Sequence, residues 1–310
     1  MKLRLWPVAA ASFLLALAAP LSARLGDSLF KGADPAALVV NGQFWLYPTG
    51  EGDELSAWSS PDLSTWKSHD PLLRLKDISW IRDGGERHYL WAPDMLAANG
   101  KYYLYYSVGP QNPTPSRLGV AVCDKPEGPC ADSGKPLFIG GKGFEAIDPM
   151  VFPDPKSHKT YLYAGGSKGA TLRVFELAPD LTTIAQEVKV DQPPGFTEGV
   201  FMHYRNGIYY LSYSSGKWDD ASYSVRYALS LSPTGPWKYA GTILQSDKKF
   251  KGPGHHAFFQ DPRDGSWLMA YGRWEHEMGD GPYTDARKVA LARVTYGPTG
   301  LIQPIDMEAQ

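Results

Sequence analysis

The sequence has 310 residues, with 31 Lys and Arg against 33 Asp and Glu and a formal net charge of −2. This mild acidity and the lack of any basic run argue against a nucleic-acid partner, because contacts to phosphates require clustered Lys and Arg. Glycine and proline number 32 and 26, and aromatic residues make up 13% of the chain. That composition is typical of short strands joined by tight turns.

Residues 1–23 have the pattern of a secretory signal peptide. Lys2 and Arg4 precede an almost wholly apolar stretch, residues 5–20, and the segment ends at Ala23. A transmembrane anchor is the alternative, but this stretch is shorter than the ~20 apolar residues that a bilayer requires. We therefore expect cleavage near Ala23 and a secreted or periplasmic mature protein without a membrane span.

Residues 24–310 are expected to form one all-β domain. Helical periodicity is nearly absent from them, whereas short β-rich runs recur, each followed by Gly, Pro, Asn or Asp. All-β propellers and barrels of this size commonly stand as single domains.

A repeat runs through this domain, in which an apolar pair and a turn are followed by an aromatic-rich strand. Its five copies, in chain order, occupy residues 38–47, 96–105, 150–163, 201–211 and 258–269. Their central leucines, at positions 46, 104, 162, 211 and 268, are 58, 58, 49 and 57 residues apart. A two-sheet sandwich is the alternative, but the fivefold recurrence favours a five-bladed β-propeller. Residues 289–305 are expected to complete the last blade.

Cys123 and Cys130 are the only cysteines and lie seven positions apart, around the turn of one repeat. In an oxidising compartment two nearby cysteines pair more often than they stay free. The sequence predicts a local disulfide that stabilises the fold by about 2 kcal/mol.

Three acidic residues occupy related places in the repeat. Asp34, Asp148 and Glu198 each precede the apolar pair that opens a blade hairpin. Because the innermost strands of all blades converge on the axis of a propeller, we expect the three acids to meet at one end of a central channel. Other Asp-Pro pairs, at 70–71, 154–155 and 261–262, are predicted to be ordinary turns.

Such a group of acids suits glycoside hydrolysis. The reaction needs one acid to protonate the leaving oxygen and a base or nucleophile at the anomeric carbon. A third acid nearby can raise a neighbour's pKa by like-charge repulsion and so keep it protonated. A carbohydrate-binding propeller without catalysis is the alternative, and it would have lost one acid, but all three are present.

The sequence blocks around these acids carry a resemblance to a known family. The blocks are Ala33-Asp34-Pro35, Trp91-Ala92-Pro93-Asp94, Ala146-Ile147-Asp148-Pro149, Thr197-Glu198-Gly199 and Gly252-Pro253-Gly254-His255-His256. In this order and on this repeat, the chain resembles glycoside hydrolase family 43. The resemblance implies a five-bladed propeller that inverts the anomeric centre, with Asp34 as general base and Glu198 as general acid. Asp148 would tune the pKa of Glu198 and hold it in place.

Three further residues are candidates for the site. The resemblance places His255 near the axis, where it would join the shell of a structural calcium ion, although calcium prefers oxygen ligands. It also gives Arg273 contacts to sugar hydroxyls in the catalytic subsite, with a surface salt bridge as the alternative. Trp91 could stack on a sugar ring or simply pack within the fold. No redox or nucleotide cofactor is expected.

The expected substrate is a polysaccharide or oligosaccharide with α-L-arabinofuranosyl linkages, as in arabinan or arabinoxylan. The resemblance covers β-xylosidases as well, so xylo-oligosaccharides are the alternative substrate. Because residues 289–305 are assigned to the last blade rather than to a second domain, arabinan-type substrates are favoured. We expect the mature protein to be a monomer.

Overall fold

The computed structural model describes residues 24–83, 86–167 and 169–308. The predicted signal peptide, residues 1–23, lies outside the described residues, so its cleavage stays a prediction. Within the described part of the chain, no helix has the length and apolar character needed to cross a membrane.

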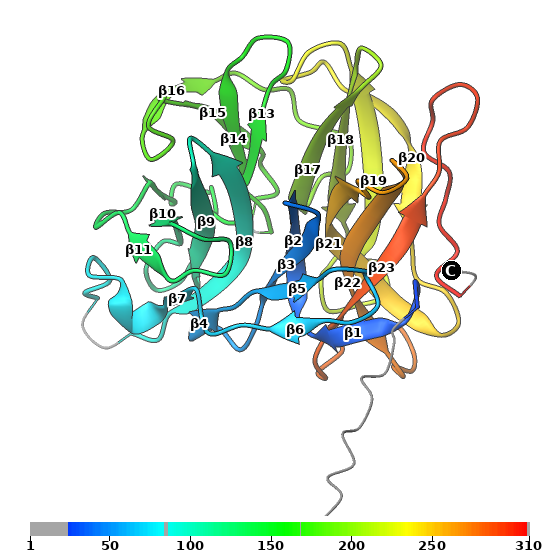
Figure 1. The fold of residues 1–310 in the computed structure, drawn as a ribbon, viewed down its shortest axis with the longest axis horizontal. Helices are drawn as coiled ribbons and strands as arrows, with labels where there is room; N and C mark the ends of the chain where they lie inside the picture. Colours follow the sequence, from blue (N-terminus) through cyan, green and yellow to red (C-terminus); the bar gives the residue numbers. More distant parts are fainter. Residues whose placement is uncertain (1–23, 84–85, 168, 309–310) are drawn as a thin grey trace, which may run out of the picture.

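Five antiparallel sheets stand around a common axis (Figure 1), which confirms the prediction of a single all-β domain shaped as a five-bladed propeller. In each sheet one strand lies nearest the axis. These inner strands are β2 (Ala33–Val40), β8 (Tyr89–Ala98), β13 (Met150–Pro153), β17 (Glu198–Arg205) and β21 (Phe250–Gln260).

The third and fourth blades are plain four-stranded meanders. Outward from β13, the third blade contains β14 (Thr160–Ala164), β15 (Arg173–Leu177) and β16 (Ile184–Val188). Outward from β17, the fourth contains β18 (Ile208–Ser215), β19 (Ser224–Ser230) and β20 (Lys238–Leu244).

The first two blades carry additional short strands on the same plan. The first contains β3 (Gln43–Thr49), β4 (Glu54–Leu55), β5 (Trp58–Ser60), β6 (Lys67–Ser68) and β7 (Leu73–Arg74), followed by a 3₁₀ turn at Leu75–Asp77. The second contains β9 (Lys101–Gly109), β10 (Arg117–Cys123), β11 (Cys130–Asp132) and β12 (Phe138–Ile139).

The fifth blade is built from both ends of the described chain. Its order is β21, β22 (Trp267–Glu275), β23 (Lys288–Val294) and then β1 (Ser28–Lys31), which pairs antiparallel with β23. The sequence analysis assigned the C-terminal segment to this blade but missed β1. A strand of four residues is too short to show a period of two, and its partner is more than 250 positions away.

Tight turns fix the strand register of three inner hairpins. Three of the five inner hairpins turn at Asn-Gly pairs: Asn41-Gly42, Asn99-Gly100 and Asn206-Gly207. The φ angles are 51° to 52° at the asparagines and 72° to 85° at the glycines. Two successive residues with positive φ make the type I′ turn that matches the twist of the flanking strands.

The hydrophobic core is divided into five clusters, each lying between neighbouring blades. The repeat's central leucines, such as Leu46 and Leu104, lie on the second strand of each blade and are at most 1% exposed. Phe44 of the first blade contacts Phe259 of the fifth with ring centroids 6.1 Å apart, so apolar contacts run right round the ring.

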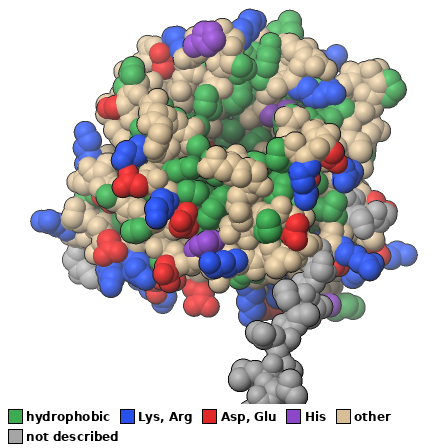
Figure 2. All heavy atoms as spheres, viewed as in Figure 1, with side chains coloured by type: hydrophobic (Ala, Val, Ile, Leu, Met, Phe, Trp, Pro, Cys, Tyr) green, Lys and Arg blue, Asp and Glu red, His purple; other side chains and the backbone are tan. Residues whose placement is uncertain are grey.

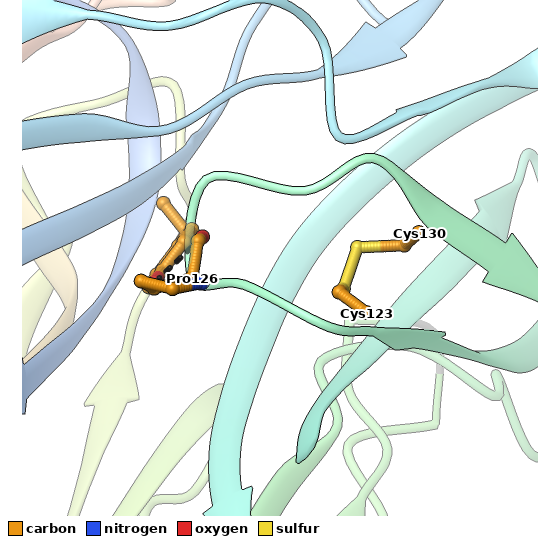
Figure 3. Close-up of a disulfide and its surroundings, with 4 residues drawn as sticks. Cys123, Pro126 and Cys130 are labelled. Atoms are coloured by element: carbon orange, nitrogen blue, oxygen red, sulfur yellow. Dashed lines mark hydrogen bonds between the residues drawn. A yellow bond between two sulfur atoms is a disulfide. The ribbon is translucent and has the colours of Figure 1, made fainter. Parts of the chain in front are cut away.

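The predicted disulfide is present. Cys123 ends β10 and Cys130 begins β11, and the bond between them closes the turn that joins the two strands (Figure 3). The hydroxyl of Tyr47, from the first blade, donates a hydrogen bond of 3.1 Å to the carbonyl of Pro126 in this turn. The disulfide therefore fixes a turn that contacts the neighbouring blade.

One face of the molecule is hollowed near its centre, and hydrophobic side chains gather around the hollow (Figure 2). Lys and Arg lie interspersed with Asp and Glu over the outer parts of this face. The mixed charge agrees with the near-neutral composition and differs from the single-sign surface that nucleic-acid binding requires.

Candidate active site

A cavity of about 900 Å³ lies where the inner strands of the blades begin. Asp34, Asp148 and Glu198 all line it, together with Trp91 and His255. Five of the six candidate residues from the sequence therefore share one cavity, although they come from five different blades.

The backbone takes the same unusual turn in every blade, within the inner strand or just before it. The residue at this turn has φ between 42° and 57°, a left-handed conformation that residues other than glycine rarely adopt. We call these five residues the bulge positions: Asp34, Ala92, Asp148, Gly199 and His255. In four blades the strand register shifts here, as in a β-bulge, which re-aims the side chains.

We call the residue directly before each bulge position a leading position: Ala33, Trp91, Ile147, Glu198 and Gly254. The first four of these line the cavity. The sequence analysis placed the three acids in one register, and the structure corrects this. Asp34 and Asp148 occupy bulge positions, whereas Glu198 occupies a leading position one residue before Gly199.

The acids lie close to one another and are nearly sealed from solvent. Their exposed fractions are 7% for Asp34, 7% for Asp148 and 6% for Glu198. Nδ1 of His255 lies 3.4 Å from Oδ1 of Asp34 and 3.5 Å from Oδ2 of Asp148. Two bulge positions with acids and one with an imidazole thus meet at the axis.

Asp34 is held ionised by its neighbours. Burial raises its pKa, but the charges of Arg287 and His255 and hydrogen bonds from Thr49 and Arg287 outweigh burial, so the pKa falls below the usual 3.8. Nη1 and Nη2 of Arg287 lie 2.8 and 3.4 Å from the two carboxylate oxygens. Asp34 is therefore a carboxylate at neutral pH and can accept a proton.

Glu198 has the opposite property. Burial raises its pKa from 4.5 to about 7, and the charge of Asp34 adds to this rise. The hydroxyl of Tyr223 donates a hydrogen bond of 2.7 Å to Oε1, which limits the rise. A large fraction of Glu198 is therefore protonated near neutral pH and can donate a proton.

A glycine makes room for this tyrosine. A Cβ atom at Gly254 would lie 2.0 Å from Cε1 of Tyr223, so any larger residue at this leading position would displace the ring. The tyrosine from the fourth blade thus occupies the place that the fifth blade leaves open.

Asp148 lies among the other acids. Its pKa is raised well above the usual 3.8 by burial and by the negative charges of Glu198 and Asp34. The N–H of Gly199 donates a hydrogen bond of 3.0 Å to Oδ2 and opposes the rise. Asp148 thus links the main chain of the Glu198 strand to the acid cluster.

A buried carboxylate kept ionised and a buried carboxyl kept protonated in one cavity form an acid and base pair. The family model of glycosyl hydrolases family 43 matches residues 29–302 of the chain. The chain belongs to this family. It is therefore a glycoside hydrolase, as the sequence blocks predicted.

Relatives support the assignment to family 43. A β-D-galactofuranosidase of Aspergillus niger is 34% identical, with 92% of this chain and 86% of that protein covered. A xylosidase/arabinosidase of Humicola insolens is 32% identical, with 69% and 80% covered. A solved β-xylosidase/α-arabinofuranosidase from a compost metagenome, in complex with xylotriose and free of calcium, superposes with a TM-score of 0.73 at 26% identity, covering 94% and 100% of the two chains.

Arg273 lies elsewhere than the sequence analysis expected, and that prediction is wrong. Its side chain is 1% exposed and is absent from the residues that line the family 43 cavity. Its guanidinium contacts Glu275, the Tyr271 hydroxyl and the Gly26 carbonyl, and lies 3.5 Å from the ring centre of Phe250. All of these contacts are within the fifth blade, so Arg273 stabilises that blade.

The arginine at the acids is Arg287, which immediately precedes β23, the partner strand of Arg273. The sequence analysis also missed Tyr223 and Glu145. Glu145 lies on the cavity wall three positions before Asp148, directly before the block Ala146-Ile147-Asp148-Pro149, and could have been found there. Arg287 and Tyr223 lie in loops whose distance from the axis the repeat does not predict.

Aromatic side chains form part of the cavity wall. Trp91 packs against Gly109, and a Cβ atom added to this glycine would lie 1.9 Å from the Trp91 ring. The Trp91 ring also stacks on Tyr89, with ring centroids 5.8 Å apart. Trp218 is 44% exposed and stacks on Trp274 with centroids 6.1 Å apart. Both tryptophans line the cavity, and such faces suit the apolar faces of sugar rings.

Proposed function

We propose that this family 43 protein hydrolyses α-L-arabinofuranosyl linkages of arabinan or arabinoxylan with inversion of the anomeric centre. The observation that carries the proposal is the divergent protonation of Asp34 and Glu198 in one cavity. An arabinoxylan arabinofuranohydrolase and an extracellular endo-α-(1→5)-L-arabinanase, both of Bacillus subtilis, support the substrate class; they are each 28% identical, over 77% and 75% of this chain.

In this proposal Glu198 protonates the leaving oxygen. Because the Tyr223 hydroxyl donates to Oε1, the proton is held on Oε2. As the glycosidic bond breaks, the bonding electron pair goes to the leaving oxygen, which takes this proton and leaves Glu198 as a carboxylate.

Asp34 activates the water in this proposal. The carboxylate takes one proton from a water molecule while the water oxygen bonds to the anomeric carbon from the opposite face. Arg287 keeps Asp34 ionised until that step. The products are a hemiacetal of inverted configuration and an alcohol, and the protons on Asp34 and Glu198 then re-equilibrate through solvent.

His255 is the residue that the proposal assigns to a structural calcium ion in the axial channel. The chain offers one imidazole nitrogen, with the carboxylates of Asp34 and Asp148 on one side of it. Since calcium takes six to eight oxygen ligands, most of its shell would come from water. The ion would supply positive charge beneath the acids, and none of the proton transfers requires it.

A second candidate substrate is the β-D-galactofuranosyl linkage. The 34% identical relative that covers 92% of this chain is named a β-D-galactofuranosidase. The rings of α-L-arabinofuranose and β-D-galactofuranose have the same configuration, and the second sugar carries one more exocyclic carbon. The same acid and base positions therefore serve both.

The test is a product assay on purified protein with arabino-oligosaccharides, xylobiose and 4-nitrophenyl β-D-galactofuranoside. We expect arabinose to be released fastest and proton NMR to detect its β-anomer first. Faster release of xylose would favour the β-xylosidase alternative, and faster cleavage of the galactofuranoside would favour the second candidate. An α-anomer as first product would refute inversion, and binding without hydrolysis would support a carbohydrate-binding propeller.

Secretion or export to the periplasm, after cleavage near Ala23, is part of the proposal, as is a monomeric state. The Cys123–Cys130 disulfide supports an oxidising compartment. N-terminal sequencing of the exported protein and its mass by light scattering test these two points.

A further inference from the structure

Three blades carry a hydroxyl at the same place on their second strand. Thr49 pairs with the leading position Ala33, Ser107 pairs with Trp91, and Ser214 pairs with Glu198. The three hydroxyls are thus equivalent under the propeller repeat, although the surrounding sequences differ.

Each hydroxyl accepts a hydrogen bond from the next blade. The main-chain N–H of Ala92 donates to Thr49 Oγ1 at 2.6 Å. The N–H of Asp148 donates to Ser107 Oγ at 2.9 Å. The N–H of His255 donates to Ser214 Oγ at 2.8 Å. In all three cases the donor is the bulge position.

The two other blade interfaces differ. Between the third and fourth blades, the bulge N–H of Gly199 donates to the carboxylate of Asp148 instead. Between the fifth and first, the residue paired with the leading position Gly254 is Gly272, which has no side chain. A hydroxyl is therefore present on both sides of the second blade and between the fourth and fifth.

These hydrogen bonds give a partner to main-chain N–H groups of the bulge positions. A left-handed conformation is unfavourable for a residue other than glycine, and a buried N–H without a partner loses the hydrogen bond that it would make to water. A hydroxyl from the neighbouring blade supplies that partner and fixes the bulge relative to the blade. Two of the three bulges, Asp148 and His255, carry side chains of the acid cluster.

Thr49 has a second contact. While its oxygen accepts the Ala92 N–H, its own proton is donated to the Asp34 carboxylate. A threonine hydroxyl has one proton to give, so both bonds fix its rotation. The Thr49 hydroxyl thus connects the bulge of the second blade to the base in the first.

We propose that Thr49, Ser107 and Ser214 form a hydroxyl belt that positions the acids and His255 for glycoside hydrolysis by holding the bulge of each following blade. The expected change in kcat rests on the proposed function. The hydrogen bonds of the belt are independent of the substrate. We class the three as positioning residues because the described contacts are to the main chain and to Asp34.

The test compares Thr49→Val, which removes the hydroxyl and keeps the shape, with Thr49→Ser, which keeps the hydroxyl. We expect Thr49→Val to lower kcat by about 10- to 100-fold with KM changed less than about twofold, because misplacement affects the chemical step. Thr49→Ser should restore most of the lost kcat.

Thr242→Val on β20 is the matched control, because this threonine lies on an outer strand. Its kcat should match the wild type. Equal losses of kcat in Thr49→Ser and Thr49→Val would overturn the proposal. Ser107→Ala, a smaller change with an expected loss of about tenfold in kcat, keeps the test available if Thr49→Val does not fold.

Hydrogen exchange separates failure of the belt from failure of the proposed function. In Thr49→Val the Ala92 amide should exchange at least about tenfold faster than in the wild type, and in Thr49→Ser it should stay protected, because a lost hydrogen bond lowers the free energy of local opening. This readout needs no substrate. Unchanged protection in Thr49→Val would overturn the belt even if every sugar assay succeeded, whereas faster exchange in a protein that cleaves no glycoside would overturn only the proposed function.

Discussion

The bulge positions and the leading positions differ by one residue in every blade, yet they carry different chemistry. One bulge position holds Asp34, the proposed base, whose pKa is lowered by Arg287. One leading position holds Glu198, the proposed acid, whose pKa is raised to about 7 by burial. Asp148 also occupies a bulge position but has a raised pKa, so the side chains around each carboxyl, above all Arg287 beside Asp34, set its protonation rather than its position in the strand.

The largest expected effect on kcat comes from substitution of Asp34, at a bulge position. Asp34→Asn removes the group that accepts the proton from water, so kcat should fall by about 10²- to 10⁴-fold for every substrate. Steady-state kinetics on an oligosaccharide and on a 4-nitrophenyl glycoside check this. Asp62→Asn, an exposed acid in the first blade, is the control. A loss confined to one class of leaving group would contradict the assignment of the base.

Substitution of Glu198, at a leading position, should lower kcat by an amount that depends on the leaving group. Glu198→Gln should lower kcat by about 10²- to 10⁴-fold on oligosaccharides, because the leaving oxygen must be protonated. The loss should be smaller on 4-nitrophenyl glycosides, whose leaving group needs little protonation. Equal losses on both substrates would mean that Glu198 does not donate the proton.

A milder change should move the pH profile. Since Glu198 acts in its protonated form, kcat/KM should fall as pH rises through about 7, which is its pKa. Tyr223→Phe removes a hydrogen bond that lowers this pKa, so the pKa should rise and the basic limb should move to higher pH. The acidic limb, which follows Asp34, should stay in place. A shift of the basic limb to lower pH would show that another group sets it.

The smallest effect on kcat is expected from removal of the Cys123–Cys130 disulfide, which lies far from the bulge and leading positions. The Cys123→Ser, Cys130→Ser double variant should lose about 2 kcal/mol of unfolding free energy, because the unfolded chain gains freedom without the disulfide. Urea denaturation measures this loss, and kcat should stay within twofold of the wild type at low temperature. A large loss of kcat would mean that the turn of the second blade helps to shape the cavity.

The repeat made much of this architecture predictable. Strand periodicity and five leucines at a nearly constant spacing predicted the blades, and the place of Asp34, Asp148 and Glu198 in the repeat predicted that they meet. The offset of Glu198 was not predictable, because a bulge changes the register without changing the sequence pattern. The sequence analysis placed Arg273 at the site wrongly, because a strand sequence shows that a side chain is inside but not whether it faces the axis or the neighbouring blade. It missed Arg287, which lies in a loop before β23.

The partnership of Asp34 and Arg287 spans 253 positions of sequence and crosses the seam where β1 pairs with β23. Until that seam forms, Asp34, the proposed general base, lacks the cation that keeps it charged. The onset of turnover during refolding therefore reports when β1 pairs with β23 and closes the propeller. It should lag behind the burial of tryptophans within single blades.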